Sequence, residues 1–196
     1  MDQRTLVAIV VLVVIAILLV AVIVVSRQRR RQRLKEHYGP EYDRAVQNRG
    51  DAGKAELELL KREERVHKFS IKPLAPEARA AYAEEWSVVQ RRFVDDPAKA
   101  VTEANALVNR VMKARGYPTA DFDQRAADIS VTYPGVVENY RSARTIAQRH
   151  ARGEAGTEDL RQAMVLYRSL FDELLDTPKS AAVPRGVIDE RIERAS

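Results

Sequence analysis

A run of twenty apolar residues, 6–25, contains no charge, glycine or proline and begins close to the amino terminus. At about 1.5 Å of rise per residue, a helix of this length covers about 30 Å, the thickness of the hydrocarbon core of a bilayer. In that environment an isolated segment can satisfy its backbone hydrogen bonds only as a helix. The run is therefore predicted to be a transmembrane helix.

A buried helix of a soluble protein and a cleaved signal peptide are the two alternatives for residues 6–25. A core helix is rarely apolar on every side over this length. A signal peptide combines a basic start, a shorter apolar region and a small-residue cleavage site. The start of this chain has only Asp2, Arg4 and the terminal amine, and no Ala-x-Ala pattern precedes the arginines that follow. The run is therefore expected to persist as an anchor.

A basic cluster, which we call the collar (residues 26–37), follows the apolar run, whereas residues 1–5 contain only Arg4 as a basic side chain. Because Lys and Arg beside a span stay on the cytoplasmic side, the amino terminus is predicted to lie outside and the body in the cytoplasm, as in a single-pass membrane protein. The collar is also a candidate for contact with anionic lipid, although a topology signal alone is the simpler interpretation. Its six basic side chains are Arg27, Arg29, Arg30, Arg31, Arg33 and Lys35.

The net positive charge of the chain comes from this collar. The whole chain has 33 Lys and Arg against 28 Asp and Glu, a net charge of +5, and residues 27–36 have six basic and one acidic side chain, which is also +5. Since Asp2 and Arg4 cancel, the residues after position 36 have 26 charges of each sign. Binding to nucleic-acid phosphates needs a basic surface. No nucleic-acid partner is therefore expected.

Sequence patterns of known catalytic and metal sites are missing. The chain has no cysteine, and it contains no nucleophile elbow, phosphate-binding loop, dinucleotide fingerprint or H-E-x-x-H pattern. His37, His67 and His150 lie apart among polar residues and are expected on the surface. The neighbouring acids Glu63-Glu64 and Glu84-Glu85 would point about 100° apart on a helix. No catalytic residue, cofactor or metal is predicted, and an enzyme is not expected.

Residues 38–176 are predicted to form one all-α domain of about five to six helices, because apolar residues recur at spacings of three and four. The helix over residues 77–94 has its aromatic side chains in one stripe and is expected to be the central core helix, although a ligand pocket is an alternative. Residues 177–196 are polar and weakly periodic and are expected to be disordered. The stripe consists of Tyr82, Trp86, Val89 and Phe93.

Capping residues and prolines predict where several helices begin and end. Asp96 and Pro97 suit the start of a helix that would fold back as a helical hairpin, and Gly116 suits the end of that helix. Asp121 and Thr157 are expected to cap two later helices. Residues 129–133 are rich in β-branched side chains and precede Pro134, so an extended connector is predicted there.

Four stretches of sequence have a distinctive wording: YGPEYDR at 38–44, WSVVQRRFVDDP at 86–97, RGYP at 115–118 and LRQAM at 160–164. Together they resemble a family of uncharacterised bacterial single-span membrane proteins, over residues 38 to about 175. The resemblance implies a bacterial membrane protein and brings no assigned activity. Tyr133 stands where a histidine is associated with the family, which argues against a catalytic histidine there.

The first of these stretches also offers candidate contacts for a partner. A Tyr-Gly-Pro turn followed by acidic, aromatic and basic side chains lies just beyond the collar, where a local turn that docks the collar onto the helical domain is the alternative. The candidate partner contacts are Tyr38, Glu41, Tyr42, Asp43 and Arg44.

Three classes of function are compatible with these features. A membrane-anchored helical interaction or scaffold module, with the lipid bilayer and an unknown protein as partners, is favoured by elimination. An unrecognised enzyme that uses carboxylates and arginines is the first alternative. A binder of anionic lipid or nucleic acid through the collar is the second.

Overall fold

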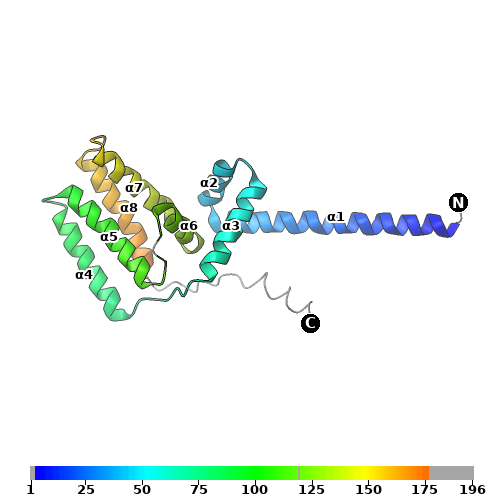
Figure 1. The fold of residues 1–196 in the computed structure, drawn as a ribbon, viewed down its shortest axis with the longest axis horizontal. Coiled ribbons are helices and arrows are strands. Elements are labelled where there is room, and N and C mark those ends of the chain that lie inside the picture. Colours follow the sequence, from blue (N-terminus) through cyan, green and yellow to red (C-terminus); the bar gives the residue numbers. More distant parts are fainter. Residues whose placement is uncertain (1–2, 119, 177–196) are drawn as a thin grey trace. The chain divides into compact units, whose positions relative to one another are not determined.

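The computed structural model describes residues 3–118 and 120–176, with side chains from residue 11 onward, and this part of the chain is helical without any strand (Figure 1). The predicted all-α class is confirmed. Internal contacts divide the chain into two units, Met1–Leu57 and Glu58–Ser196. The predicted disordered tail, 177–196, lies outside the described residues. The helices are α1 (Gln3–Tyr38), α2 (Pro40–Arg49), α3 (Ala52–His67), α4 (Pro76–Arg92), α5 (Pro97–Ala114), α6 (Phe122–Thr132), α7 (Val137–Ala151) and α8 (Thr157–Leu175).

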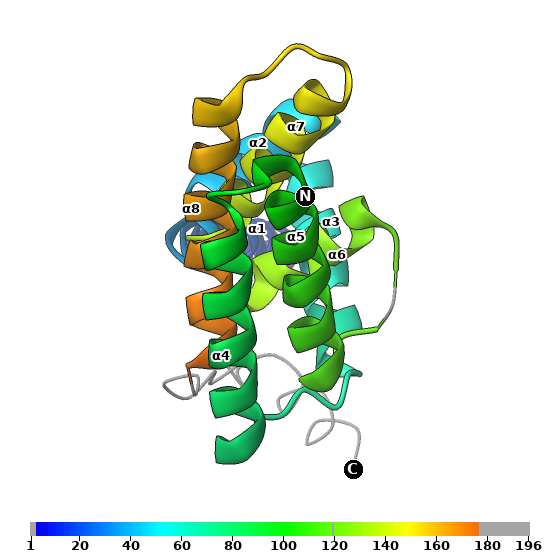
Figure 2. The same ribbon diagram turned by 90° about the vertical axis from the view of Figure 1, so that its left-hand side faces the viewer.

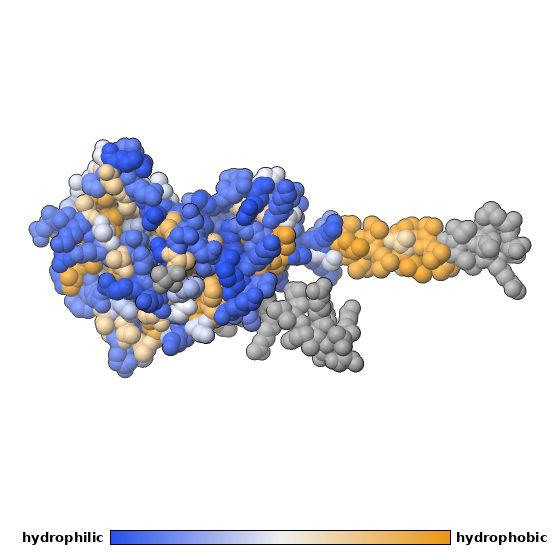
Figure 3. All heavy atoms as spheres, viewed as in Figure 1, coloured by the Kyte–Doolittle hydropathy of each residue, from blue (hydrophilic) through white to orange (hydrophobic). Residues whose placement is uncertain are grey.

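Helix α1 contains the apolar run, and its segment Val11–Tyr38 is long and apolar enough to cross a membrane by length and composition. The mean hydropathy of its most apolar window is 2.7, and no residue of that window is buried. Figure 3 shows these side chains as an apolar band along the helix. In a soluble protein such a surface would have to be covered. The prediction that residues 6–25 form a helix is confirmed. This helix continues without a break through the collar.

The first unit has a small core of its own, in which α2 and the first turn of α3 pack on the carboxyl-terminal end of α1. Gly50 ends α2 in a left-handed conformation, with φ of 66°, and its amide donates to the carbonyl of Val46. This glycine makes the short turn into α3 possible. The buried apolar side chains of this core are Leu34, Tyr38, Tyr42, Ala45 and Ala55.

Helices α5 and α8 pack against each other and against most other helices of the second unit, which makes them its centre. In Figure 2, α4 lies in front of this pair. Each of them buries seven side chains, and α5 packs against α4, α7 and α8. The prediction that the helix over residues 77–94 is central was wrong, because α4 buries only Trp86 and Val89. The rest of α4 is rich in alanine and glutamate, so this helix covers one side of the pair.

Trp86 is the main anchor of α4. Its side chain is 3% exposed and stacks on Phe171 of α8, with ring centroids 4.6 Å apart. Tyr82 and Phe93, at the ends of the predicted stripe, are only partly buried. The interpretation of Trp86 and Val89 as core residues is confirmed.

Helix α6 corrects a second prediction, since residues 129–132 continue it instead of forming an extended connector. The amide of Tyr133 still donates to the carbonyl of Ile129, at 2.8 Å, and the chain leaves the helical conformation only at Tyr133. Pro134 restricts the residue before it and no earlier one. Because Ile129 and Val131 are buried, packing outweighs the low helix propensity of β-branched residues.

The predicted helix starts agree closely with the structure. The side chain of Asp96 accepts from the amide of Lys99 at 2.9 Å, and Asp121 accepts from the amide of Gln124 at 2.8 Å. The start of α8 differs by one residue: Gly156 is the capping position, and its amide donates to Asp159. Thr157 is therefore the first helical residue. Glu158 and Asp159 lie in the first turn, where the positive end of the helix dipole favours acidic side chains.

The substitution Trp86→Ala tests the role of this side chain. We expect it to lower the unfolding free energy of the full chain in detergent micelles by about 3 to 5 kcal/mol, because truncating a buried aromatic leaves a cavity. Chemical unfolding followed by circular dichroism measures the change. Val88→Ala, at a position that is 41% exposed on the same helix, is the control and should change the free energy little. Equal stability of the Trp86 variant and the native chain would contradict the assignment.

Candidate functional site

The collar residues all lie on α1, which arranges them around the helix. Arg27, Arg29, Arg30, Arg31 and Lys35 are exposed, and Arg33 is partly buried. Arg31 and Lys35 both contact Tyr42 of α2, and the Lys35 ammonium lies 5.5 Å from the centre of the Tyr42 ring. The arginines nearest the apolar run, Arg27, Arg29 and Arg30, are exposed.

Tyr42 joins the collar to α3. The Arg31 Nε donates to the Tyr42 hydroxyl at 3.2 Å, and that hydroxyl donates to the Glu56 carboxylate at 2.9 Å. Arg31 also lies 3.7 Å from Glu56. Burial, followed by the hydrogen bond to Glu56, raises the pKa of Tyr42 above its usual value. Glu56 was not recognised as a site residue, because nothing in the local pattern of α3 distinguishes it from other surface acids.

The stretch at 38–44 turns part of itself inward. Tyr38, Glu41 and Tyr42 are buried, whereas Asp43 and Arg44 are exposed. Buried side chains in this stretch support the alternative of a local docking turn within the first unit. Asp43 and Arg44 are the two candidate partner contacts that a partner could reach.

Arg115, at the carboxyl-terminal end of α5, is the largest fully buried side chain of the described residues. Its Nη1 donates to the Tyr133 hydroxyl at 2.6 Å and to the Leu174 carbonyl at 2.9 Å. Arg115 thus joins the end of α5 to the ends of α6 and α8, where the helix dipoles are negative. Its Nε and Nη2 have no acceptor among the described residues.

The neighbours of Arg115 in the RGYP stretch are structural as well. Gly116 has φ of 99°, and a Cβ at this position would overlap the carbonyl oxygen of Ser70. The Tyr117 hydroxyl donates to Thr132 at 3.1 Å. The amide of Lys72 donates to the Arg115 carbonyl, which ties the α3–α4 connection to this corner.

A second polar cluster links α3 to α6 within the second unit. The Asp128 carboxylate is buried and accepts from Arg65 at 2.7 Å and from Gln124 at 2.8 Å. Arg62 donates to Ser130 at 3.4 Å and pairs with Glu58. These are the side chains that an arginine and carboxylate enzyme would require, but here each carboxylate is occupied by an arginine. The cluster therefore fastens α3 to α6.

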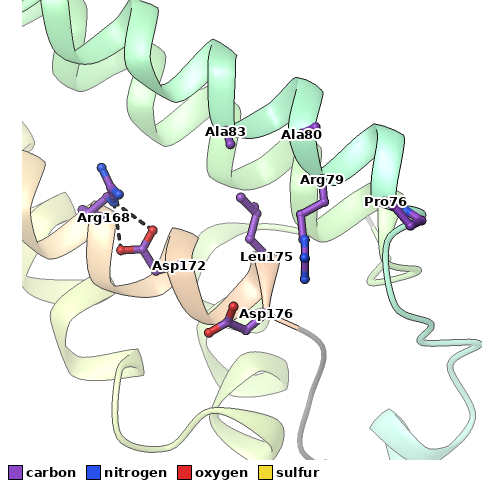
Figure 4. Close-up of a pocket in the computed structure, with 8 residues that line it drawn as sticks. All are labelled: Pro76, Arg79, Ala80, Ala83, Arg168, Asp172, Leu175 and Asp176. Carbon is purple, nitrogen blue, oxygen red and sulfur yellow. Dashed lines mark hydrogen bonds and ion pairs between the residues drawn. The ribbon is translucent and has the colours of Figure 1, made fainter.

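A groove of about 590 Å³ lies between the start of α4 and the end of α8 (Figure 4). Arg168 and Asp172 point toward each other across 2.8 Å and so satisfy one another. Arg79 extends from α4 beside Leu175 and Asp176. The groove thus has two cations and two carboxylates around a small apolar floor, and no histidine or hydroxyl nucleophile lines it.

The remaining candidates for chemistry lie apart. His37 and His67 are exposed as expected, whereas His150 is partly buried, with Nδ1 2.9 Å from the Ala155 carbonyl. No group of three or more His, Asp or Glu side chains among the described residues could hold a metal ion. The neighbouring acids of α3 and α4 form surface ion pairs, namely Glu64 with Lys68, Glu84 with Arg91 and Glu85 with Arg110.

The buried hydroxyls do not act as bases at neutral pH. Burial raises the pKa of Tyr117 to about 12, and burial also raises the pKa of Tyr133 even though Arg115 lies beside it. Both phenols are therefore protonated and serve as hydrogen-bond donors or acceptors. The arrangement around Arg115 joins the ends of three helices.

Comparison of the chain with protein-family models, with curated proteins and with solved structures found no match in any of the three. The resemblance to the family of uncharacterised single-span proteins stays a prediction.

The substitution Arg115→Met tests the role of the buried guanidinium. We expect it to lower the unfolding free energy by about 3 kcal/mol, because the Tyr133 hydroxyl and the Leu174 carbonyl would be left without their charged donor. Arg110→Met, which removes an exposed arginine of the same helix, should cost about 1 kcal/mol or less. Chemical unfolding in micelles measures both variants. Equal losses would show that Arg115 is no more important than a surface arginine.

The raised pKa of Tyr117 predicts a loss of stability in alkali. The folded chain keeps the phenol proton up to about pH 12, whereas the unfolded chain releases it near the ordinary tyrosine pKa of 10.0. The stabilisation is therefore complete below pH 10 and is lost as the pH rises from 10 toward 12. Unfolding free energies at pH 8 and pH 11 should differ less in Tyr117→Phe than in the native chain, by about 1 kcal/mol. The same pH dependence in both would contradict the prediction.

Proposed function

We propose that this chain is a single-pass protein of a bacterial cytoplasmic membrane, anchored by α1, with its amino terminus outside and helices α2 to α8 in the cytoplasm. The observation that carries the proposal is the exposed apolar surface of α1, which continues without a break into a basic collar. Leu12 and Val22 are 66% and 65% exposed, and water is a poor solvent for such a surface. The collar supports the orientation.

We further propose that the second unit serves as an interaction module for a protein partner. Its buried polar residues are occupied in joining helices, as with Arg115 and Asp128. Its surface carries many charged side chains, and its interior is a single apolar core of buried helix residues. A surface of this kind recognises other proteins through a few anchoring side chains. The collar has a second role, because its basic side chains contact anionic lipid headgroups beside the span.

The orientation is tested with reporters fused to the carboxyl terminus. A reporter active only outside the cytoplasm should stay silent, and one active only inside should work. Replacing Arg27, Arg29 and Arg30 by Gln should turn part of the population around, because these arginines hold the orientation. The matched control replaces Arg152, Arg161 and Arg168 by Gln and should leave the orientation unchanged. Strong activity of the outside reporter on the native chain would refute the topology.

The role as a module is tested by crosslinking in cells, followed by purification from membranes. The native chain should yield a reproducible crosslinked protein at positions on the surface of the second unit. The Trp86→Ala variant, in which this unit is destabilised, should lose it while remaining in the membrane. A crosslink pattern that is indifferent to this substitution would count against the module.

A further inference from the structure

Helices α6 and α7 carry three arginines without a carboxylate ion pair among the described residues, and two of these three lie on one aromatic cluster. Of the fourteen arginines in residues 58–176, nine form an ion pair with Asp or Glu. The buried Arg115 contacts helix ends, and Arg149 donates to the carbonyl of Glu154. Arg79 lines the groove beside Leu175 and Asp176. Only Arg125 and Arg144 remain, and they lie on one aromatic cluster.

The cluster contacts both guanidinium groups, and both arginines are partly buried. Arg144 lies over the Phe122 ring, 4.4 Å from its centre, and Phe122 lies 4.7 Å from Tyr140 between ring centroids. Arg125 Nε donates to the Tyr140 hydroxyl at 3.4 Å, and that hydroxyl donates to Asn109 at 3.2 Å. We call Phe122, Arg125 and Arg144 the arginine–aromatic face, and the fully buried Tyr140 contacts both Phe122 and Arg125.

Both arginines of this face keep unused donors. Among the described residues Arg144 makes only the ring contact, and Arg125 uses Nε and one further nitrogen, which donates to the Ala120 carbonyl. The nearby Asp121 is occupied as the cap of α6. Burial is the largest influence on the pKa of Tyr140 and raises it, while the charges of both arginines lower it, so both act on the same ring.

Partial burial makes these charges better suited to recognition than freely solvated ones. Arg125, Arg144 and Phe122 are all partly buried. An arginine held on an aromatic ring loses little freedom when it binds, and its planar fork matches a carboxylate. Arginine and aromatic side chains are also the ones that contribute most to binding at protein interfaces.

We infer that the arginine–aromatic face binds an acidic segment of a protein partner, with Asp or Glu carboxylates placed against Arg125 and Arg144. This inference rests on the proposed role of the second unit as an interaction module and names the chemistry of the partner. Carboxylates are favoured over nucleic-acid phosphates because residues 58–176 have nineteen basic and nineteen acidic side chains and so no net positive field.

The test uses the purified full chain in nanodiscs of zwitterionic phosphatidylcholine and a fluorescent oligoglutamate peptide as the probe. A photo-crosslinking residue replaces Thr145, which is exposed and adjacent to Arg144 on α7. A second preparation has the crosslinker at Gln162, which is exposed and adjacent to the paired Arg161 on α8. We expect a high yield at position 145 that falls as salt is raised, and a low yield at position 162. Because the yield is local, peptide bound at the collar does not contribute to it.

Substitutions then identify the side chains responsible. The double variant Arg125→Met with Arg144→Met should lower the yield at position 145 about tenfold. Arg144→Met alone should lower it in part and leaves the hydrogen bonds of Arg125 intact, so a loss there cannot be ascribed to unfolding. The matched control, Arg152→Met with Arg161→Met, removes two arginines that are already paired and should leave the yield unchanged.

Three results would overturn the inference: equal yields at positions 145 and 162, no change in the double variant, or stronger labelling at position 145 by duplex DNA than by the peptide. The measurement does not depend on membrane orientation in the cell. A reversed topology would therefore refute the proposed function and leave peptide binding intact. An inactive face, with partner crosslinks elsewhere on the second unit, would refute only this inference.

Discussion

The buried guanidinium of Arg115 is the interaction on which the second unit depends most. Helices α5, α6 and α8 all end around it, so their negative dipole ends converge on one fixed positive charge. Without this cation, the Leu174 carbonyl at the end of α8 would lose its charged donor. The close approach at Gly116 and the hydrogen bond from Lys72 place the α3–α4 connection at the same corner.

Apolar packing and buried polar contacts have different roles in the second unit. Apolar side chains of α5 and α8 supply the burial that drives folding. Pairs such as Arg65 with Asp128 fix the relative position of α3 and α6, because a buried carboxylate is stable only where its donors are in place. Helix α6, which is short, is therefore held in one position by both kinds of contact.

The parts of this fold that could be read from the sequence are those set by neighbouring residues. The cap of Asp96, the turn at Gly50 and the apolar run all depend on a few consecutive positions. The pairs that join distant elements could not be read in this way: Arg115 meets Leu174, and Arg65 meets Asp128, across about sixty positions. The errors at residues 129–133 and at α4 have the same origin, since burial by distant helices decided both. Arg125 and Arg144 carry no local signal either.

The proposed topology makes the collar serve two purposes within a short distance. Arg31 is six positions beyond Val25, which is about 9 Å along a helix, so its contact with Tyr42 and Glu56 would begin in the headgroup region. The same cluster of basic residues would then both set the orientation of α1 and start the first folded unit. Because Tyr42 and Glu56 already engage Arg31, contact with lipid would fall mainly to Arg27, Arg29 and Arg30, the arginines nearest the span. In this topology, the turn of α1 nearest the span would contact lipid, and the following turn would contact α2 and α3.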